Sequence, residues 1–327
     1  MKILLIQMKR IGDLILLAPV LDRLRKHDPK THITLVTNEA SKGILPLLGA
    51  DETLVFGKGI GGTDFWKKFF TVRSGLHACL DFSGNDRSAL LTALSRAPLR
   101  ASYTRFQKKP LRKIAYNHFV DSSVAQRHTV DHHLDLLSAL NIPFETTPLK
   151  LRLPTTPRED KQILRNNTVS DNYAIIHPGT ARAEKYWQAK SWAQIADALH
   201  EKYKLQVVMT GAPDPTEAAH RKEILRLSKA PIISFAEKLS LPQLAAVITE
   251  AKILIGVDSA PCHMADGLSC PTVALFGPTN PFHWRPRGEK SIVVTPGNQR
   301  WDGPKWPHPE MKNLDTKDVL ACIEKIL

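Results

Sequence analysis

Short apolar runs alternate with longer segments of helical periodicity over most of the chain. In the first half, β-rich runs predict strands at residues 2–7, 32–37, 52–56 and 78–82. Amphipathic segments lie between them, among them a helix predicted up to His27 and another at residues 87–95. Strands that alternate with helices form parallel βαβ units, so this half is predicted to be a doubly wound α/β domain.

The alternation breaks at a group of prolines and then starts again. The group consists of Pro143, Pro148, Pro154 and Pro157, a spacing typical of a connection between domains. Further strands are predicted at residues 173–176, 206–210, 232–235, 252–256 and 272–276, and a long loop at 299–309 precedes a final helix at 315–326. We therefore expect two Rossmann-like α/β domains, 1–155 and 156–327, with parallel sheets facing a central cleft.

The composition is that of a globular protein without a transmembrane segment. The longest apolar runs are far shorter than the roughly 20 residues that span a bilayer. Gln7, Lys9 and Arg10 interrupt the N-terminal apolar run, which therefore does not resemble a signal peptide, and we expect a cytoplasmic protein. The four cysteines form no C-x-x-C pair, so reduced and mostly buried thiols are expected in place of disulfides or a metal site.

The net charge of +13 is the one unusual total. It predicts attraction to a polyanion: nucleic acid, an anionic membrane surface or a phosphorylated substrate. Seven basic residues crowd one stretch of the first half: Arg96, Arg100, Arg105, Lys108, Lys109, Arg112 and Lys113. We expect an anionic partner to bind this stretch, although a solvated basic surface would show the same pattern.

One glycine-rich motif has two competing interpretations. Gly57 to Gly62 matches G-x-G-x-x-G, with glycines at 57, 59 and 62, and Asp81 stands about where the ribose-binding acid of a nicotinamide-cofactor site would lie. The motif follows the third predicted strand instead of the first. This position favours a flexible loop at the mouth of the cleft over a dinucleotide site.

A histidine-rich segment also has two interpretations. Its polar residues are His128, Asp131, His132, His133 and Asp135, and their i,i+4 pairs share helix faces that could hold a metal. Apolar residues at 130, 134, 137 and 139 instead form the stripe of an ordinary amphipathic helix. We therefore expect no metal here and the polar residues on the exposed side of the helix. No D-x-D pair, P-loop or G-x-S-x-G elbow occurs, which disfavours metal-dependent transfer, phosphate-chain hydrolysis and serine-esterase chemistry.

Three turns in the second half are predicted to bind phosphate. They are residues 175–180 with Lys185 close behind, residues 256–263, and residues 275–280, and each ends a predicted strand. In the second turn, Ser259 and Ala260 begin a helix whose N-terminal amides favour an anion. Since the carboxyl ends of parallel strands meet at one edge, the three turns together predict a diphosphate-bearing ligand.

Four ordered blocks of the sequence resemble a known family. They are KILLIQMKRIGDLILLAPVL, HPGTARAEKYWQAKSW, VVMTGAPD and SLPQLAAVITEAKILIGVDSAPCHMADGLSCPTVALFGPTNP, distributed over nearly the whole chain. The family is that of the ADP-heptose:lipopolysaccharide heptosyltransferases, glycosyltransferases of the GT-B fold. The resemblance implies an inverting transfer of heptose from ADP-heptose to the lipopolysaccharide inner core, with no cofactor, no required metal and no nucleic-acid partner.

The resemblance also implies roles for individual residues. Asp13 would be the base that deprotonates the acceptor hydroxyl, Gly12 would allow close approach to the backbone, and Lys185 would offset charge on the departing ADP. The residues assigned to donor binding are Gly12, Thr180, Lys185, Leu239, Asp258, Ser259, Ala260 and His263. The basic stretch would bind the anionic acceptor, and a peripheral contact with the cytoplasmic face of the inner membrane is compatible with such a substrate.

The sequence departs from the family pattern at the ribose. The acid that the family places after the G-A-P turn is replaced by Pro215, and Asp214 and Glu217 are the two substitutes nearby. Three other functions remain open: transfer from another nucleotide sugar, a nicotinamide-dependent oxidoreductase using the glycine-rich motif and Asp81, and binding of nucleic acid through the basic surface. Asp13 also has a structural interpretation, in which it caps a helix and has no catalytic role.

Overall fold

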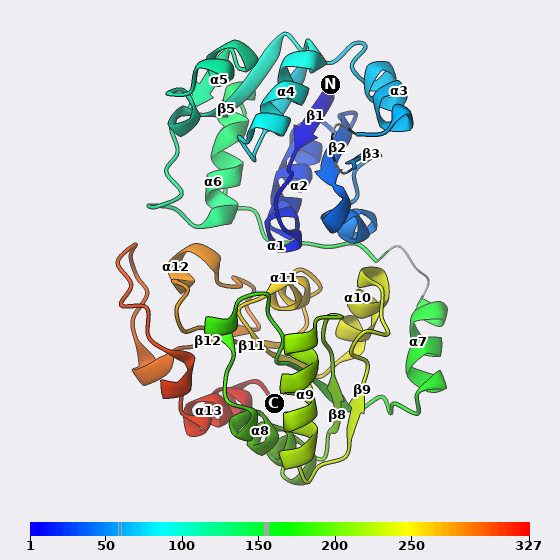
Figure 1. Ribbon diagram of the computed structural model, residues 1–327, viewed down its shortest axis with the longest axis vertical. Coiled ribbons are helices and arrows are strands. Elements are labelled where there is room, and N and C mark those ends of the chain that lie inside the picture. Colours follow the sequence, from blue (N-terminus) through cyan, green and yellow to red (C-terminus); the bar gives the residue numbers. More distant parts are fainter. Residues whose placement is uncertain (58, 60, 154–156) are drawn as a thin grey trace. The chain divides into compact units, whose positions relative to one another are not determined.

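The chain forms two α/β units, Met1–Arg152 and Leu153–Leu327, in a computed structural model that describes residues 1–57, 59, 61–153 and 157–327 (Figure 1). The domain boundary predicted at residue 155 lies in 154–156, outside the described residues, as do Pro154 of the proline group and Lys58 and Ile60 of the glycine-rich motif.

The first unit is built on a six-stranded parallel sheet of order β3-β2-β1-β4-β5-β6. Its strands are β1 (Lys2–Ile6), β2 (His32–Asn38), β3 (Glu52–Phe56), β4 (Ala78–Asp81), β5 (Leu99–Tyr103) and β6 (His118–Val120). All four strands predicted in this half are present. The strand order changes direction between β1 and β4, and in such sheets the loops that follow these two strands form the ligand-binding crevice.

Helices cover both faces of this sheet (Figure 1). They are α1 (Ile11–Ile15), α2 (Ala18–His27), η1 (Glu39–Leu47), α3 (Thr63–Val72), α4 (Asp86–Ser95), η2 (Thr104–Phe106), α5 (Pro110–Ala115), α6 (Thr129–Asp135) and η3 (Leu136–Leu140). The helix expected up to His27 is divided in two, because Pro19 lies in the first turn of α2 and cannot donate the hydrogen bond that a continuous helix needs. The break leaves α1 as a short helix directly after β1.

The second unit repeats the topology of the first. Its parallel sheet has the order β12-β11-β10-β7-β8-β9. The strands are β7 (Tyr173–His177), β8 (Gln206–Met209), β9 (Ile232–Ser234), β10 (Ile253–Val257), β11 (Thr272–Leu275) and β12 (Ser291–Val294). Here the direction changes between β7 and β10. The predicted doubly wound architecture is therefore confirmed in both halves.

The helices of the second unit enclose an aromatic and aliphatic core. They are α7 (Pro157–Asn166), η4 (Ala183–Lys185), α8 (Ala189–Glu201), α9 (Pro215–Leu227), α10 (Leu241–Glu250), α11 (Ala260–Gly267), α12 (Pro281–Trp284), η5 (Pro296–Asn298), η6 (Met311–Asn313) and α13 (Thr316–Ile326). Trp187 and Trp192 pack edge to face at 5.4 Å, and the Trp187 indole donates to the Leu314 carbonyl at 3.0 Å. These contacts attach the C-terminal segment to the sheet.

The long loop after residue 298 has no regular structure up to residue 310, as predicted. Trp306 Nε1 donates to the Gly277 carbonyl at 2.8 Å, and Asn280 Nδ2 donates to the Gly303 carbonyl at 3.1 Å. The loop is therefore attached to the turn that follows β11.

Two predictions from composition can be compared with the described residues. Among them, no helix has the length and apolar character needed to cross a bilayer. The cysteines are free thiols: Cys79, Cys262 and Cys270 are buried, and Cys322 is half-buried.

Candidate active site

Asp13 lies at the carboxyl edge of the first sheet, in the first turn of α1. The N-cap residue of α1 is Arg10, which makes no side-chain capping hydrogen bond, so Asp13 is not the cap of this helix. The loop before it is held in place because Asn38 Nδ2 and Ser41 Oγ each donate to the Lys9 carbonyl at 2.9 Å. Lys9 Nζ lies 3.9 Å from Asp13 Oδ1, and the Asp13 side chain is 15% exposed. The carboxylate is thus partly accessible and lies beside a cation.

Asp81, at the end of β4, is fully buried. Its Oδ1 accepts from the backbone N–H groups of Ser83 and Gly84 at 2.8 and 3.0 Å, and its Oδ2 accepts from the Tyr116 hydroxyl at 2.6 Å. Burial raises the pKa of this carboxyl group. Both oxygens of Asp81 are therefore used in hydrogen bonds that fix the turn after β4, and neither is accessible to a ribose.

The nicotinamide alternative also conflicts with the topology. The glycine-rich motif follows β3, which is the edge strand of its sheet, whereas a dinucleotide-binding loop follows the strand at the change of direction. Because Asp81 is buried, the glycine-rich motif has no accessible acid to bind a ribose. We therefore interpret its described residues as a connection between β3 and α3.

The expected exposure of the histidine-rich helix is wrong for its histidines. His128, His132 and His133 are each at most 2% exposed. Interior partners contact one nitrogen of each of two rings: His132 Nδ1 lies 2.8 Å from the hydroxyl of Ser122, and His133 Nδ1 lies 3.2 Å from the Leu16 carbonyl. Among the described residues, no group of three or more His, Cys, Asp or Glu side chains is arranged to hold a metal ion.

Burial keeps the two inner histidines neutral. Desolvation lowers the pKa of His132 to about 2 and that of His133 to about 3, and the charges of Lys9 and Arg105 contribute to both shifts. An unfolded chain protonates these rings near pH 6.5, so the unfolded state binds more protons below that pH. Their contribution to stability is complete above about pH 6.5 and is lost as the pH falls towards the folded-state values.

We expect His133→Gln to reduce the pH dependence of stability. Each such histidine adds up to about 1.4 kcal/mol per pH unit to the slope of the unfolding free energy below pH 6.5. Urea unfolding at pH 5, 6 and 7 measures this slope. His118→Gln, which changes an exposed histidine of the same unit, should leave the slope at the wild-type value. Equal slopes for both variants would show that His133 is not held neutral in the folded protein.

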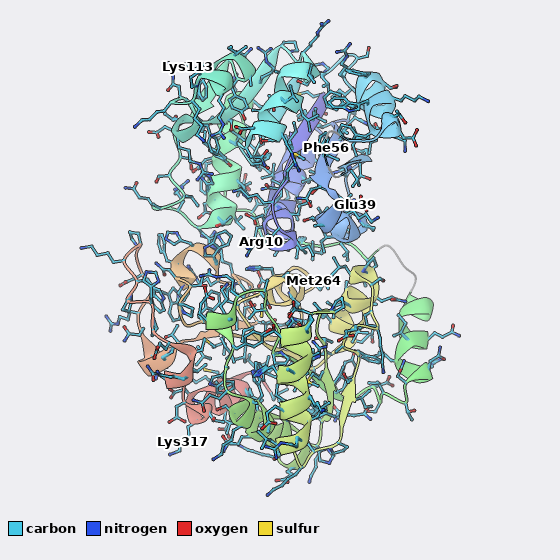
Figure 2. The ribbon with its side chains drawn as sticks, in the orientation of Figure 1. Arg10, Glu39, Phe56, Lys113, Met264 and Lys317 are labelled. Carbon is cyan, nitrogen blue, oxygen red and sulfur yellow. The ribbon has the colours of Figure 1, made fainter. Side chains whose placement is uncertain are left out.

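The predicted basic stretch does not converge as a whole, although Arg105 and Arg112 both lie over the ring of Phe106. Arg100 donates to the backbone carbonyls of Ala97 and Ala115 at 2.9 Å, and Arg112 forms an ion pair with Asp86 at 3.2 Å. Figure 2 shows Lys113 at the end of the first unit that is remote from Arg10. Arg96 is the C-cap of α4, and Lys108 and Lys109 are exposed. Arg105 is the member of the stretch that directly follows a strand at the carboxyl edge.

The three phosphate-binding turns predicted for the second half end neighbouring strands. They follow β7, β10 and β11, which are adjacent in the order β11-β10-β7, so the turns share one edge as expected. Across this edge, Lys185 Nζ donates to Asp258 Oδ2 at 2.5 Å and to the Asp258 carbonyl at 3.2 Å. The two side chains are 13% and 8% exposed. The edge therefore carries a nearly buried ion pair between two predicted site residues.

The helix α11 begins directly after Asp258. Its N-cap residue is Ser259, whose hydroxyl donates back to the Val257 carbonyl at 3.0 Å and does not cap the helix. A Cβ at Gly256 would lie 2.8 Å from Cys262 Sγ, so glycine lets the first turn pack against β10. His263 lies in this turn and is 4% exposed. The helix start thus has the positive end of a helix dipole without a side-chain cap.

The two candidate ribose acids have different positions. Glu217 is 5% exposed, accepts from the Ala212 N–H at 2.8 Å, and occupies the space where a Cβ of Gly179 would lie. Asp214 is the exposed N-cap of α9 and accepts from two of its backbone N–H groups. Thr180 is nearly buried in the same turn as Gly179, and Leu239 is half-buried in the connection before α10.

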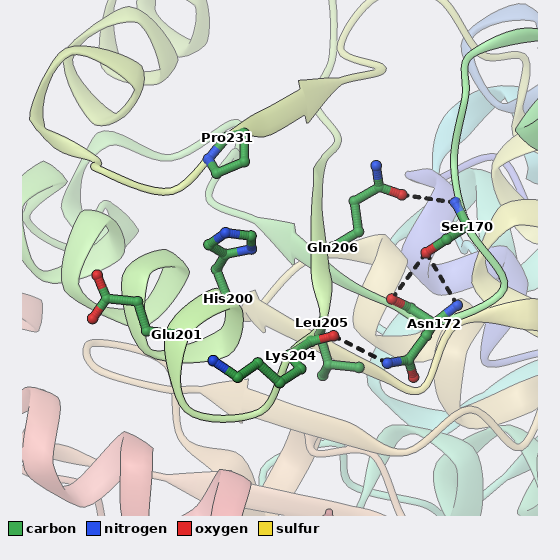
Figure 3. A pocket seen from close by; sticks show the side chains of 8 residues that line it. All are labelled: Ser170, Asn172, His200, Glu201, Lys204, Leu205, Gln206 and Pro231. Carbon is green, nitrogen blue, oxygen red and sulfur yellow. Dashed lines mark hydrogen bonds between the residues drawn. The ribbon is translucent and has the colours of Figure 1, made fainter.

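A surface depression of about 460 Å³ lies at the opposite edge of the second sheet, where β7 and β8 begin (Figure 3). Two of its polar side chains are bonded to the lining backbone: Gln206 Oε1 accepts from the Ser170 N–H at 2.7 Å, and Asn172 Nδ2 donates to the Lys204 carbonyl at 3.1 Å. These bonds fix the loops that line it. We assign no function to this depression.

Comparison with known families identifies the chain. The family model of glycosyltransferase family 9 (heptosyltransferase) matches residues 71–311. The chain belongs to this family. It is therefore a glycosyltransferase of the heptosyltransferase type, as the sequence blocks predicted.

A curated heptosyltransferase and two solved structures match nearly the whole chain. Lipopolysaccharide heptosyltransferase 3 of Escherichia coli (strain K12) is 27% identical over 343 residues, covering 98% of this chain and 96% of the relative. The glycosyltransferase family 9 structure from Veillonella parvula DSM 2008 has a TM-score of 0.84 at 23% identity, covering 99% and 96%. The E. coli ADP-heptose lps heptosyltransferase II structure has a TM-score of 0.80 at 20% identity, covering 100% and 98%. These likenesses confirm the GT-B fold.

Proposed function

We propose that this family 9 protein transfers heptose from ADP-heptose to the inner core of lipopolysaccharide, with inversion at the anomeric carbon. The observation that carries the proposal is the Lys185–Asp258 pair at the uncapped start of α11. It combines a cation with helix amides on the edge where open α/β sheets bind ligands. The names of the E. coli relatives, which are lipopolysaccharide and ADP-heptose heptosyltransferases, support this choice of substrates.

The donor binds to the second unit in this proposal. The diphosphate contacts Lys185, Thr180 and the first-turn amides of α11 that follow Ser259, including that of Ala260. Asp258 and His263 contact the sugar, and backbone groups near Leu239 contact the adenine. Of the two acids that could bind the ribose we favour Asp214, because its side chain is exposed whereas that of Glu217 is buried.

The acceptor binds to the first unit, where Asp13 acts as the base. Asp13 accepts the proton of the acceptor hydroxyl while that oxygen forms a bond to the anomeric carbon of heptose. The bond from this carbon to the β-phosphate oxygen breaks, and ADP leaves with the electron pair. Lys185 stabilises the negative charge that grows on the leaving diphosphate, which is the role of a fixed cation in such a transition state. Gly12, next to Asp13, leaves space for the sugar to approach.

We also propose a peripheral contact with an anionic membrane surface, where a lipid-linked acceptor would be found. Its support is the net charge of +13 and the exposed end of α5, where Ile114 is 76% exposed beside Lys113. Co-sedimentation with phosphatidylglycerol vesicles, and not with phosphatidylcholine vesicles, would support this contact.

Two measurements test the main proposal. Calorimetric titration with ADP, UDP, NAD and a short DNA duplex should show binding of ADP alone in the micromolar range typical of enzyme substrates. Mass spectrometry of a heptose-free inner-core acceptor incubated with ADP-heptose should show the addition of one heptose. Binding of NAD without binding of ADP would favour an oxidoreductase, and transfer from a UDP-sugar would favour another donor.

A further inference from the structure

Arg105 presents a guanidinium group that lies against two aromatic rings. Its Cζ lies 4.6 Å from the ring centroid of Phe106 and 5.4 Å from that of Tyr103. Among the part of the chain that the structure describes, it forms no ion pair, and the residue is exposed. The aromatic faces hold the cation in position while its planar N–H donors remain for a ligand.

The packing around Gly84 places Arg105 over the end of β4. Gly84 has a φ of +60°, and a Cβ there would lie 2.0 Å from the Phe106 ring. The helix η2, which contains Arg105 and Phe106, therefore lies directly on the turn that follows β4. A larger residue at position 84 would displace this helix.

Lys9 reaches the same place from the other side of β4. It follows β1, and the strand order β1-β4-β5 puts the ends of β1 and β5 about 10 Å apart, since neighbouring strands are spaced by about 4.8 Å. Two long basic side chains can close that gap. The pKa of Lys9 is lowered, mainly by burial, and the charge of Arg105 contributes to the shift, as expected for neighbouring cations.

The ammonium group of Lys9 also keeps its donors. Its distance of 3.9 Å from Asp13 Oδ1 exceeds hydrogen-bond length, so the two charges attract each other without a direct bond. Asp13, which is partly accessible, can thus neutralise part of the charge of the two cations at this edge. The nearby Asp81 is buried and bonded within its own turn.

We propose that Lys9 and Arg105 together bind an oxyanion of the acceptor, either a sugar carboxylate or a phosphate ester, beside the hydroxyl that Asp13 deprotonates. This inference rests on the proposed function and adds a specificity-determining pair to it. The arginine fork suits the two oxygens of a carboxylate or phosphate, and the lysine adds a point charge next to the base. Arg100 is excluded from this role because its guanidinium donates to two backbone carbonyls, and Arg112 is excluded because it is 7% exposed and paired with Asp86.

The test compares acceptor kinetics of the wild type with Arg105→Gln and Lys9→Met. We expect each change to raise the KM for the acceptor roughly ten- to a hundredfold, the loss of one charge-assisted hydrogen bond, with the KM for ADP-heptose within about twofold of wild type. Lys30→Gln, which removes an exposed cation before β2 at the opposite edge of the sheet, is the matched control and should change neither KM. Circular dichroism and thermal melting verify that each variant is folded.

Modified acceptors identify the oxyanion. Two modified acceptors are compared, one with its phosphates removed and one with its carboxylates reduced to alcohols. The wild type should show a raised KM for whichever of them lacks the group that Lys9 and Arg105 bind. For that acceptor, Arg105→Gln should have no further effect, because the group it binds is missing. Unchanged acceptor KM in both variants, with active wild-type enzyme, would overturn the inference. Absence of heptose transfer by the wild type would instead overturn the proposed function.

Discussion

Replacing Asp13 with asparagine is expected to lower kcat for heptose transfer by roughly 10²–10⁴-fold, the range typical of a lost general base. Asparagine keeps the size of the side chain but cannot accept the proton from the acceptor hydroxyl. The affinity for ADP, which we assign to the second unit, should stay near the wild-type value. Steady-state kinetics with the natural acceptor and calorimetry with ADP measure the two effects separately.

A control for this substitution is available in the same unit. Asp22→Asn also removes a carboxylate paired with a lysine four residues away in the sequence, but it lies on α2, away from the carboxyl edge. This variant should transfer heptose at the wild-type rate. Near wild-type kcat for Asp13→Asn would show that Asp13 has a structural function only, and the proposed base would have to be sought elsewhere at this edge.

The sequence predicted the strands best where burial on both faces makes them continuously apolar. β1 and β10 are of this kind, and their positions agree with the structure to within one residue at each end. β5, β6 and β12 were not predicted. β5 contains Arg100 and Ser102, and β6 is three residues long, so their hydrogen bonds to neighbouring strands define them more than their own pattern does.

The candidate site was predictable where a local motif determines it. The turns after β7, β10 and β11 could be placed on one edge because parallel strands have only one carboxyl edge. The ion pair between Lys185 and Asp258 joins residues 73 positions apart and could not be derived from spacing. The proximity of Lys9 to Asp13 was missed although the i,i+4 spacing in the opening block was a usable signal.

Tertiary packing overrode the sequence pattern at the histidines. Helical periodicity placed His132 and His133 opposite the apolar stripe, yet both are buried: the ring of Tyr103 in β5 stacks on His132, and the carbonyl of Leu16, the C-cap residue of α1, contacts His133. An imidazole can be buried when its N–H finds an acceptor, so periodicity alone does not decide on which side a histidine lies. The basic stretch failed as a unit for a related reason. Arg100 donates to backbone carbonyls and Arg112 pairs with Asp86, whereas Arg105 is the arginine of the stretch that is exposed directly after a strand at the carboxyl edge.

Replacing Lys185 with alanine is expected to weaken ADP-heptose binding and to lower kcat/KM for the donor by roughly 10²–10³-fold. The cation interacts more strongly with the leaving diphosphate in the transition state than in the bound donor, because negative charge grows there as the bond breaks. The effect should therefore appear in kcat as well as in KM. Lys190→Ala removes an exposed lysine from the start of α8 and is the matched control, with both constants unchanged.

The loss of Lys185 has a second consequence that must be separated from catalysis. It leaves the Asp258 carboxylate, 8% exposed, without its cation, and removing one partner of a buried pair costs stability. Lys185→Ala should thus lower the melting temperature, and Lys185→Ala combined with Asp258→Asn should recover part of that loss while transfer stays low. If the double variant regained both stability and activity, the pair would be structural, and the charge on the departing ADP would have to be stabilised by other groups at the start of α11.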